Sequence, residues 1–454
     1  MTQSFFAPKV WLNQAWTTDV LLTVSASGHW QQIELSPCVE AKRKAHTLVG
    51  YTLPGVANTH SHAFQRAIVG MTESASPNTQ RSASADSFWT WRDQMYRTAL
   101  RVGPDAVERI ATHLYRELLL GGYTHVCEFN YLHNDLDGSP YADPLTLSMA
   151  HVRAAQAVGI GLTLLPTLYM RSGFSSSDLS IDQRRFASTP QSVLDIACKI
   201  NALNYPLINA GVAVHSLRAV DVDAIIELTT QAKQIGLPIH IHIAEQLQEV
   251  DDCLALHGQR PIEFLMNRVG VDSYWNLVHA THANKDEISH IRASGAAIVI
   301  CPSTEANLGD GIVDLPSLLQ SQTPWSIGSD SHVSRSWLDE LRLLEYSQRL
   351  HLCQRNVSAH YTVFESLTQP SDAPSSAGAL LAGALKGASA ATGCALGAIA
   401  IGQRADFSQW DGQASLGHDG FLRETDDCYF LDQLIFSHPS LQPSSVYIAG
   451  KKVV

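Results

Sequence analysis

Tyr51-Thr-Leu-Pro-Gly-Val-Ala-Asn-Thr-His60-Ser-His62 is the stretch from which the fold can be predicted. Residues 51–57 form an apolar run containing Pro54-Gly55, which is typical of a short buried strand that ends where the histidines begin. Alternation along a strand puts residues two apart on one face, so His60 and His62 can direct two imidazoles at one point. The pair alone indicates a metal only weakly, because histidines at this spacing also occur by chance.

Seven more short apolar runs follow, separated by stretches with the periodicity of helices. Such alternation is typical of βα units around a parallel sheet, and eight units predict a (β/α)8 TIM-like barrel of the α/β class. The helices with the clearest pattern are 104–120, 221–236 and 334–350. The predicted strands are 51–57, 124–129, 161–166, 211–215, 238–242, 276–279, 297–301 and 325–328.

Both ends of the chain predict strands of another kind. Apolar and polar residues alternate in 1–50, which indicates antiparallel strands, and segments 392–397, 401–408 and 445–454 show a similar pattern. We therefore expect residues 1–50 and 388–454 to form one small discontinuous β-sandwich domain, with 51–387 as the catalytic barrel.

Composition limits the class of function. With 454 residues, 45% of them hydrophobic, the chain can bury a large core. The net charge of −12 gives no support for nucleic acid or an anionic membrane as a partner. The eight cysteines contain no Cys-x-x-Cys pair, which argues against a zinc ribbon or a disulfide framework and fits a reducing, cytoplasmic location. We expect neither a secretory signal nor a transmembrane span.

Polar residues follow several predicted strands, at the end where such barrels carry their reactive residues. They are His60, His62, His215, His242, His279 and Asp330. Neutral imidazoles and one carboxylate suit zinc with a position left open for water, which then ionises near neutral pH and attacks a carbon. Any one of these histidines taken alone is more often a core residue. We expect His240 to face the opposite side from His242, and Glu245 either to transfer protons or to cap a helix.

This arrangement resembles the amidohydrolase superfamily, in particular its deaminase branch. The resemblance implies one divalent metal ion, with Zn²⁺ expected, held by His60, His62, His242 and Asp330. Relatives with two ions carry a lysine after the fourth strand, and the segment 213–218 contains none.

Further motifs make the resemblance closer to members that hydrolyse a linear amidine, and they cover essentially the whole chain. The motifs are 60–66, 87–92, 128–133, 215–218, 301–311 and 328–334. The implied small-molecule substrate is the dianion N-formimidoyl-L-glutamate of histidine degradation, and the implied products are N-formyl-L-glutamate and ammonia. Asn130 departs from the pattern where a histidine is expected, and Arg335 departs from it at a position expected to lie away from the substrate.

A dianionic substrate needs arginines, whose planar forks bind carboxylates, and the motifs select Arg92 and Arg218. The resemblance adds Gln65, Tyr131 and His215 as substrate-binding residues, and Arg66 follows Gln65 in the same motif. It implies that Glu245, His279 and Asp330 share the proton transfers, without dividing them. Arg92 could instead be a surface residue of the segment 63–103, which is long for a βα loop and is a candidate lid.

Two other functions stay open. A deaminase of the same fold acting on a heterocycle such as guanine or a pterin would use the same metal site, with a stacking pocket in place of two arginines. A catalytically silent binding barrel would take up no zinc. A phosphate-binding barrel is disfavoured, because no glycine-rich loop ends in Lys-Ser or Lys-Thr. The protein partner that we expect is a second copy of the chain, in a homodimer.

Overall fold

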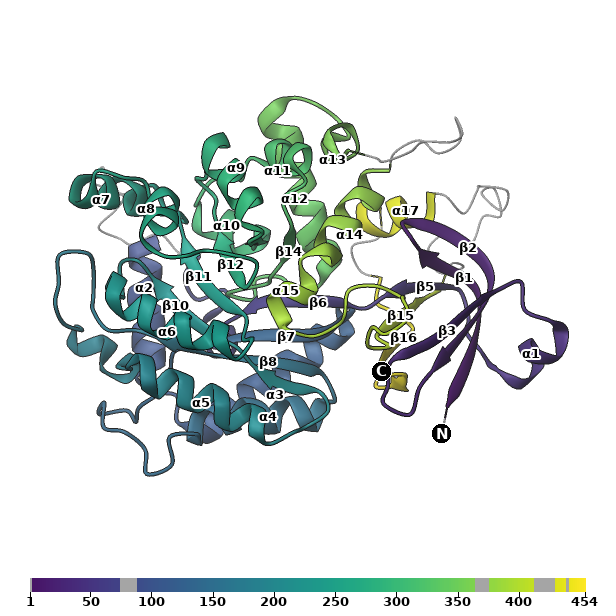
Figure 1. Ribbon diagram of the computed structural model, residues 1–454, viewed down its shortest axis with the longest axis horizontal. Coiled ribbons are helices and arrows are strands. Elements are labelled where there is room, and N and C mark those ends of the chain that lie inside the picture. Colours follow the sequence, from purple (N-terminus) through teal and green to yellow (C-terminus); the bar gives the residue numbers. More distant parts are fainter. Residues whose placement is uncertain (1, 74–87, 364–374, 412–428, 438–440) are drawn as a thin grey trace.

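The computed structural model describes residues 2–73, 88–363, 375–411, 429–437 and 441–454, and all structural statements below refer to these residues. A barrel and a smaller sheet lie side by side (Figure 1), and the small sheet combines strands from the two ends of the chain. The predicted fold class is therefore confirmed. The division into domains at residues 50 and 388 stays a prediction.

Eight parallel strands form the barrel. Hydrogen bonds join each to the next in the order of the chain, and β9 (Ile208–Ala210) pairs with β8 outside this path. The barrel strands are β6 (Val56–Ser61), β7 (Tyr123–Asn130), β8 (Gly161–Leu168), β10 (Val212–Ser216), β11 (Ile239–Ile243), β12 (Trp275–His279), β13 (Ala297–Ile300) and β14 (Trp325–Ile327).

Helices cover the outside of the barrel. The three predicted helices are confirmed as α3 (Pro104–Leu120), α6 (Val222–Gln234) and α12 (Trp337–Leu352). Local signals set their ends: Pro104 occupies the first turn of α3, and the Asp221 carboxylate accepts the Ala224 N–H at the start of α6. The others are α4 (Thr146–Val158), α5 (Pro190–Ala202), α7 (Leu247–His257), α8 (Pro261–Arg268), α9 (Lys285–Ser294), α10 (Pro302–Leu308), α11 (Leu315–Ser321), α13 (Val357–Tyr361), α14 (Ser376–Lys386) and α17 (Phe430–Phe436).

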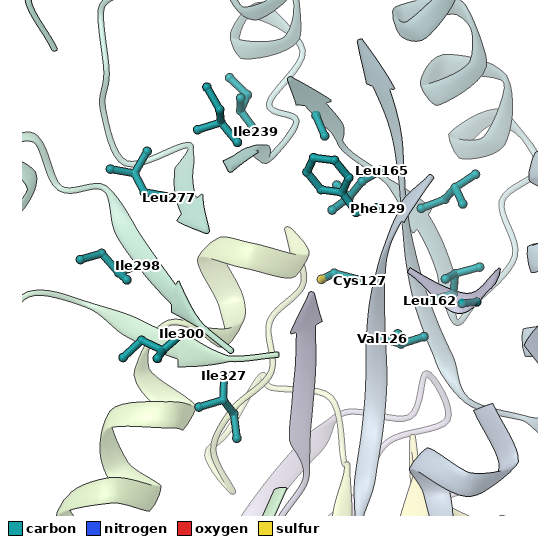
Figure 2. Close-up of a cluster of buried hydrophobic side chains, with 14 of the residues drawn as sticks. Val126, Cys127, Phe129, Leu162, Leu165, Ile239, Leu277, Ile298, Ile300 and Ile327 are labelled. Atoms are coloured by element: carbon teal, nitrogen blue, oxygen red, sulfur yellow. The ribbon is translucent and has the colours of Figure 1, made fainter. Parts of the chain in front are cut away.

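The barrel core is apolar, and a short helix closes its base. Figure 2 shows part of this core, including Phe129 of β7 and Leu277 of β12. The carbonyl of Ala391 in α15 (Ala388–Thr392) accepts a hydrogen bond from the His240 ring at 2.8 Å. His240 thus has a backbone partner, but its expected position on the opposite face from His242 is wrong, because residues two apart on a strand share a face.

The predicted first strand, 51–57, is two strands in different sheets. β5 (Tyr51–Pro54) pairs with the terminal strands, and β6 begins the barrel after Gly55. A Cβ at Gly55 would lie 2.5 Å from Thr124 Oγ1 and 2.7 Å from Asp406 Cβ. Glycine is required because the chain crosses between the sheets where both pack against it.

The small sheet folds over a core of its own. Its order is β17 (Lys451–Lys452), β16 (Ser445–Ile448), β15 (Phe407–Trp410), β5, β1 (Gln3–Leu12), β2 (Ala15–Val24) and β3 (Trp30–Leu35), with β4 (His46–Thr47) beside β1 and α1 (Val39–Lys44) before β4. Trp30 and Phe407 come from strands far apart in this order, yet their ring centroids are 5.5 Å apart, so the sheet closes into a sandwich. The strand predicted at 392–397 is absent, and of the strand predicted at 401–408 only residues 407–408 are extended, at the start of β15, since 393–406 contains only a bridge at Arg404.

The barrel closes between its last and first strands by way of Asp330. The Asp330 N–H donates to the His60 carbonyl at 3.0 Å, and the His62 N–H donates to the Asp330 carbonyl at 3.1 Å. Gly328 permits this approach, because a Cβ there would lie 2.6 Å from the His60 Cβ. Closure therefore brings residues 270 positions apart in sequence next to each other at one end of the barrel.

None of the described helices is long and apolar enough to cross a bilayer.

A buried ion pair joins the small sheet to the barrel. Arg404 donates to both carboxylate oxygens of Asp406, at 2.5 and 2.9 Å, and to the His125 ring of β7 at 3.1 Å. Asp406 also accepts the Ala449 N–H at 2.9 Å. Burial and the nearby arginine lower the pKa of His125, so its neutral ring can accept a hydrogen bond from Arg404.

We predict that Arg404→Ala lowers the free energy of unfolding by about 3–5 kcal/mol, because it leaves the Asp406 carboxylate buried without its cation. Denaturant titration of the purified protein measures this. The matched control is Arg153→Ala, which removes an exposed pair with Glu108 and should cost less than about 1 kcal/mol. Equal effects of the two changes would contradict a structural role for the buried pair.

Candidate active site at the carboxyl ends of the barrel strands

Three imidazole nitrogens converge at the carboxyl ends of β6 and β11. The Nε2 atom of His60 lies 3.1 Å from that of His62 and 3.0 Å from that of His242, and the His62 and His242 atoms are 3.3 Å apart. A tetrahedral metal about 2.0–2.1 Å from each nitrogen holds its ligands about 3.3 Å apart. The three atoms therefore outline one face of a coordination tetrahedron.

The outer ring nitrogens determine which tautomer faces this point. His62 Nδ1 donates to the Phe129 carbonyl at 2.9 Å, and His242 Nδ1 donates to the His215 carbonyl at 2.9 Å. Burial lowers the pKa of His60, His62 and His242, so the rings are neutral, and the carbonyl partners of His62 and His242 leave the Nε2 lone pairs of these two rings facing the common point. Lone pairs this close repel one another unless a cation lies between them, so the residues present fit a divalent metal.

Asp330 adds an oxygen to the nitrogen set. Its Oδ1 atom lies 3.4 Å from His62 Nε2 and 3.5 Å from His60 Nε2. Among the described residues, His60, His62 and Asp330 form a group with the spacing of metal ligands, and a second such group combines His60 and His242 with His279. One carboxylate with neutral imidazoles matches the ligand preference of zinc.

His279 is surrounded by carboxylates beside the proposed ligands. Its Nε2 atom lies 3.7 Å from Glu245 Oε1 and 3.8 Å from Asp330 Oδ2, and its Nδ1 atom lies 3.2 Å from Glu305 Oε1. Burial acts to lower the pKa of His279, but the surrounding carboxylates outweigh it and raise the pKa to about 10. Burial, aided by the charge of Asp330, raises the pKa of Glu245 to about 7. Such a pair can hold and pass a proton near neutral pH.

The strand ends at the site adopt left-handed backbone conformations. Non-glycine residues with positive φ include Ala244 (51°), His279 (69°), Ala280 (50°), Asp330 (46°) and His332 (66°). Each follows or ends β11, β12 or β14. Strain of this kind persists where the surrounding structure enforces it, and it is concentrated at functional sites.

One cavity joins the metal-ligand set to the predicted substrate-binding residues. Its lining includes His62, His242, Glu245, His279 and Asp330. It also includes the predicted residues Gln65, Arg92, Tyr131, His215 and Arg218, together with Trp91, Met95, Tyr96, Tyr169, Phe186 and Leu308. His60 is completely buried and is not among the lining residues. All the predicted site residues are therefore brought together, while their roles stay predictions.

Gln65 and Tyr131 form a polar pair in this cavity. The Gln65 Nε2 atom donates to the Tyr131 hydroxyl at 2.9 Å, and Gln65 Oε1 is buried without a donor among the described residues. Asn130 bonds to the backbone of Leu132 through both its side-chain atoms, at 3.3 Å, and so brackets Tyr131. A buried amide oxygen without a donor favours a substrate N–H as its partner.

Two arginines near the site have structural partners instead. Arg66, which follows Gln65 in the first motif, forms an ion pair with Glu117 at 2.8 Å and does not line the cavity. Arg335 lies near the same carboxylate, at 3.7 Å, and also lies away from the cavity, as expected.

Sequence reasoning missed Glu305 and the aromatic wall of the cavity, which is formed by Tyr96, Tyr169 and Phe186. Glu305 lies in the motif 301–311, and its carboxylate contacts both His279 and the Cys301 N–H, the latter at 2.8 Å. A carboxylate inside a motif was the available signal. Tyr96, Tyr169 and Phe186 gave none, because an aromatic residue in a helix or strand is normally core.

Sequence comparisons with known proteins identify the family of this chain. A model of the amidohydrolase family matches residues 51–453. The chain belongs to the amidohydrolase family. It is 43% identical over 453 residues to the formimidoylglutamate deiminase of Pseudomonas aeruginosa, covering 99% of this chain and 94% of that one. A 5-methylthioadenosine/S-adenosylhomocysteine deaminase of Shouchella clausii is 23% identical over 421 residues, covering 91% and 84% of the two chains.

Solved amidohydrolase structures agree with the fold. An amidohydrolase from Brucella melitensis superposes with a TM-score of 0.87 at 36% identity, covering 99% of this chain and 94% of that one. An adenosine deaminase from Xanthomonas campestris, described with bound zinc, gives a TM-score of 0.76 at 22% identity, covering 99% and 92%, and this likeness shows the fold alone.

We predict that His60→Ala and His242→Ala abolish tight binding of a divalent metal, because each removes one nitrogen of the set. Metal analysis of the dialysed proteins should fall from about one ion per chain to near zero. His240→Ala is the control, since His240 lies on the same strand but bonds to Ala391 at the base. Full metal content in both ligand variants would contradict this assignment.

Proposed function

We propose that the chain hydrolyses N-formimidoyl-L-glutamate to N-formyl-L-glutamate and ammonia, with one zinc ion. The observation that carries this proposal is the cavity, whose lining combines nitrogens and carboxylates of the predicted metal site with Arg92 and Arg218. The full-length similarity to a formimidoylglutamate deiminase supports the choice of substrate. Two guanidinium groups match a ligand with two carboxylates, since their planar forks bind carboxylates with two parallel hydrogen bonds.

Binding would leave the amidine end of the substrate at the metal ligands. His60, His62, His242 and Asp330 would hold the ion, which when bound supplies a Lewis-acid centre for hydrolysis. Gln65 Oε1 would accept an N–H of the formimidoyl group, and the Tyr131 hydroxyl, which accepts from Gln65 and donates to Met95 Sδ at 3.6 Å, would redirect its proton to the substrate.

Glu245 and His279 would move the protons. Water adds to the formimidoyl carbon, both protons of the water pass to the terminal nitrogen, the bond between that nitrogen and the carbon breaks, and the nitrogen leaves as ammonia. Glu245, with its pKa raised to about 7 by burial, can take up a proton from the water and deliver it to this nitrogen. His279, whose Nε2 atom lies 3.7 Å from Glu245 and 3.8 Å from Asp330, would orient the attacking water or stabilise negative charge that develops at the reacting carbon's oxygen.

A deaminase acting on a heterocycle is the second candidate. The observation in its favour is the aromatic wall of Tyr96, Tyr169 and Phe186, against which a ring could stack. Against it, the two arginines would face an uncharged base. The 43% identity with the formimidoylglutamate deiminase also exceeds the 23% identity with the nucleoside deaminase.

The proposed substrate implies a cellular setting. A place in histidine degradation and a location in the cytoplasm follow from the same assignment, and the cysteine pattern fits a reducing compartment. We also propose a homodimer, for which gel filtration with light scattering is the test.

We predict that the zinc-loaded protein releases ammonia from N-formimidoyl-L-glutamate and not from guanine, pterins, adenosine or cytosine. An assay of ammonia release over this panel checks the prediction. Activity on a ring substrate alone would replace the proposed function with the second candidate. No turnover in a zinc-loaded protein would favour a binding barrel.

We predict that Glu245→Gln keeps the metal but lowers kcat by about 10²–10⁴-fold, because the amide cannot carry the proton. Steady-state kinetics and metal analysis of the same preparation measure the two effects. Glu227→Gln, on the exposed face of α6, is the matched control and should leave both unchanged. An unchanged kcat in Glu245→Gln would rule out the proton-transfer role.

A further inference from the structure

Gln183 lies behind the aromatic wall of the cavity, in the short 3-10 helix η3 (Ile181–Phe186). Its side chain is 1% exposed. The Nε2 atom donates to the Tyr96 hydroxyl at 2.8 Å and to the Tyr169 hydroxyl at 2.9 Å, and the Oε1 atom accepts the Ser180 N–H at 3.0 Å. One amide therefore joins three segments, and all of its hydrogen-bonding groups are used.

The first of these contacts leads to Arg92. Tyr96 and Arg92 lie one turn apart on α2 (Phe88–Ala99), the helix at the described end of the long segment between β6 and α3. The Arg92 guanidinium lies over the Tyr96 ring, 5.5 Å from its centroid. A planar cation on the face of an aromatic ring is held in position as well as stabilised. Fixing the Tyr96 hydroxyl thus fixes the surface on which Arg92 rests.

The second contact leads to residues of the barrel strands. Tyr169 follows β8 directly, and its ring packs against His215 with centroids 4.3 Å apart. Phe186, at the end of η3, packs against both tyrosines, with centroids 5.8 Å from Tyr96 and 5.3 Å from Tyr169. Gln183 and Phe186 together tie the helix that carries Arg92 to the barrel strand beside His215.

We infer that Gln183 is a positioning residue that sets the specificity of the site for a substrate with two carboxylates. The inference rests on the proposed function and deepens it. By clasping α2 to the barrel through Tyr96 and Tyr169, Gln183 holds Arg92 at a fixed distance from Arg218, so the two guanidinium groups match one length of diacid. Gln183 lines no part of the cavity itself, so it acts on the substrate only through these neighbours.

The test replaces Gln183 with methionine, which keeps the volume and removes the hydrogen bonds. We expect KM for N-formimidoyl-L-glutamate to rise at least about tenfold, with kcat within about twofold and metal content unchanged, because only the carboxylate grip is disturbed. Gln191→Met is the matched control: Gln191 is an exposed glutamine whose amide bonds to Asp195 on α5, and its loss should change nothing.

Analogues with one carboxylate separate positioning from general loosening. N-formimidoylglycine keeps the α-carboxylate, and 4-(formimidoylamino)butanoate keeps the distal one. If Gln183 acts through Arg92, the substitution lowers kcat/KM for N-formimidoyl-L-glutamate and for one analogue. It leaves kcat/KM for the other analogue within about twofold of its value in the unsubstituted protein. Equal losses for both analogues, or a fall in kcat with KM unchanged, would overturn the inference.

Hydrogen exchange tests the clasp without relying on the substrate. In Gln183→Met the amides of α2 around Tyr96 should exchange faster than in the parent, while those of α3 stay unchanged. Tyr96→Phe should accelerate the same amides, and the double variant should add little to either single change. Unchanged exchange in α2 would refute the clasp. If exchange in α2 is faster but the unsubstituted protein turns over no formimidoyl substrate, the proposed function is refuted, while the role of Gln183 in holding α2 against the barrel is supported.

Discussion

The candidate metal site depends on three neutral imidazoles whose Nε2 atoms converge on one point. His62 and His242 donate their outer protons to backbone carbonyls, so their inner nitrogens can only offer lone pairs to the common point. Burial prevents the alternative of protonation, because it lowers the pKa of all three rings. A cation between nitrogens held 3.0–3.3 Å apart would satisfy these lone pairs together. The tautomers, the burial and the strand register thus all favour a cation at this point.

Barrel closure supplies the fourth group. The backbone hydrogen bonds between Asp330 and β6 join the last strand to the first, and they also set the Asp330 carboxylate beside His60 and His62. Stability and function share these contacts, so a change at Gly328 or Asp330 would affect both. The left-handed backbone of Asp330 and His332 is maintained because the closed barrel leaves the chain no other path.

The sequence predicted the features that follow from strand period. His60, His62, His215, His242, His279 and Asp330 each follow or end a strand, so placing the strands placed these residues, and their chemistry predicted the metal. The first strand was misjudged because residues 51–57 read as one apolar run, whereas Gly55 divides it between two sheets. The aromatic wall and Gln183 behind it were missed for a different reason. Tyr96, Tyr169 and Gln183 meet only in the folded chain, and nothing in their local sequence distinguishes them from ordinary core residues.

The most direct test of this account is X-ray absorption at the zinc edge of the loaded protein. Three imidazole nitrogens at about 2.0–2.1 Å and protein or solvent oxygen at about 2.0–2.2 Å are expected, with no sulfur near 2.3 Å. That result would show the ion at the point where His60, His62 and His242 converge. A sulfur ligand, or a shell with fewer than two imidazoles, would place the ion elsewhere and contradict the central claim.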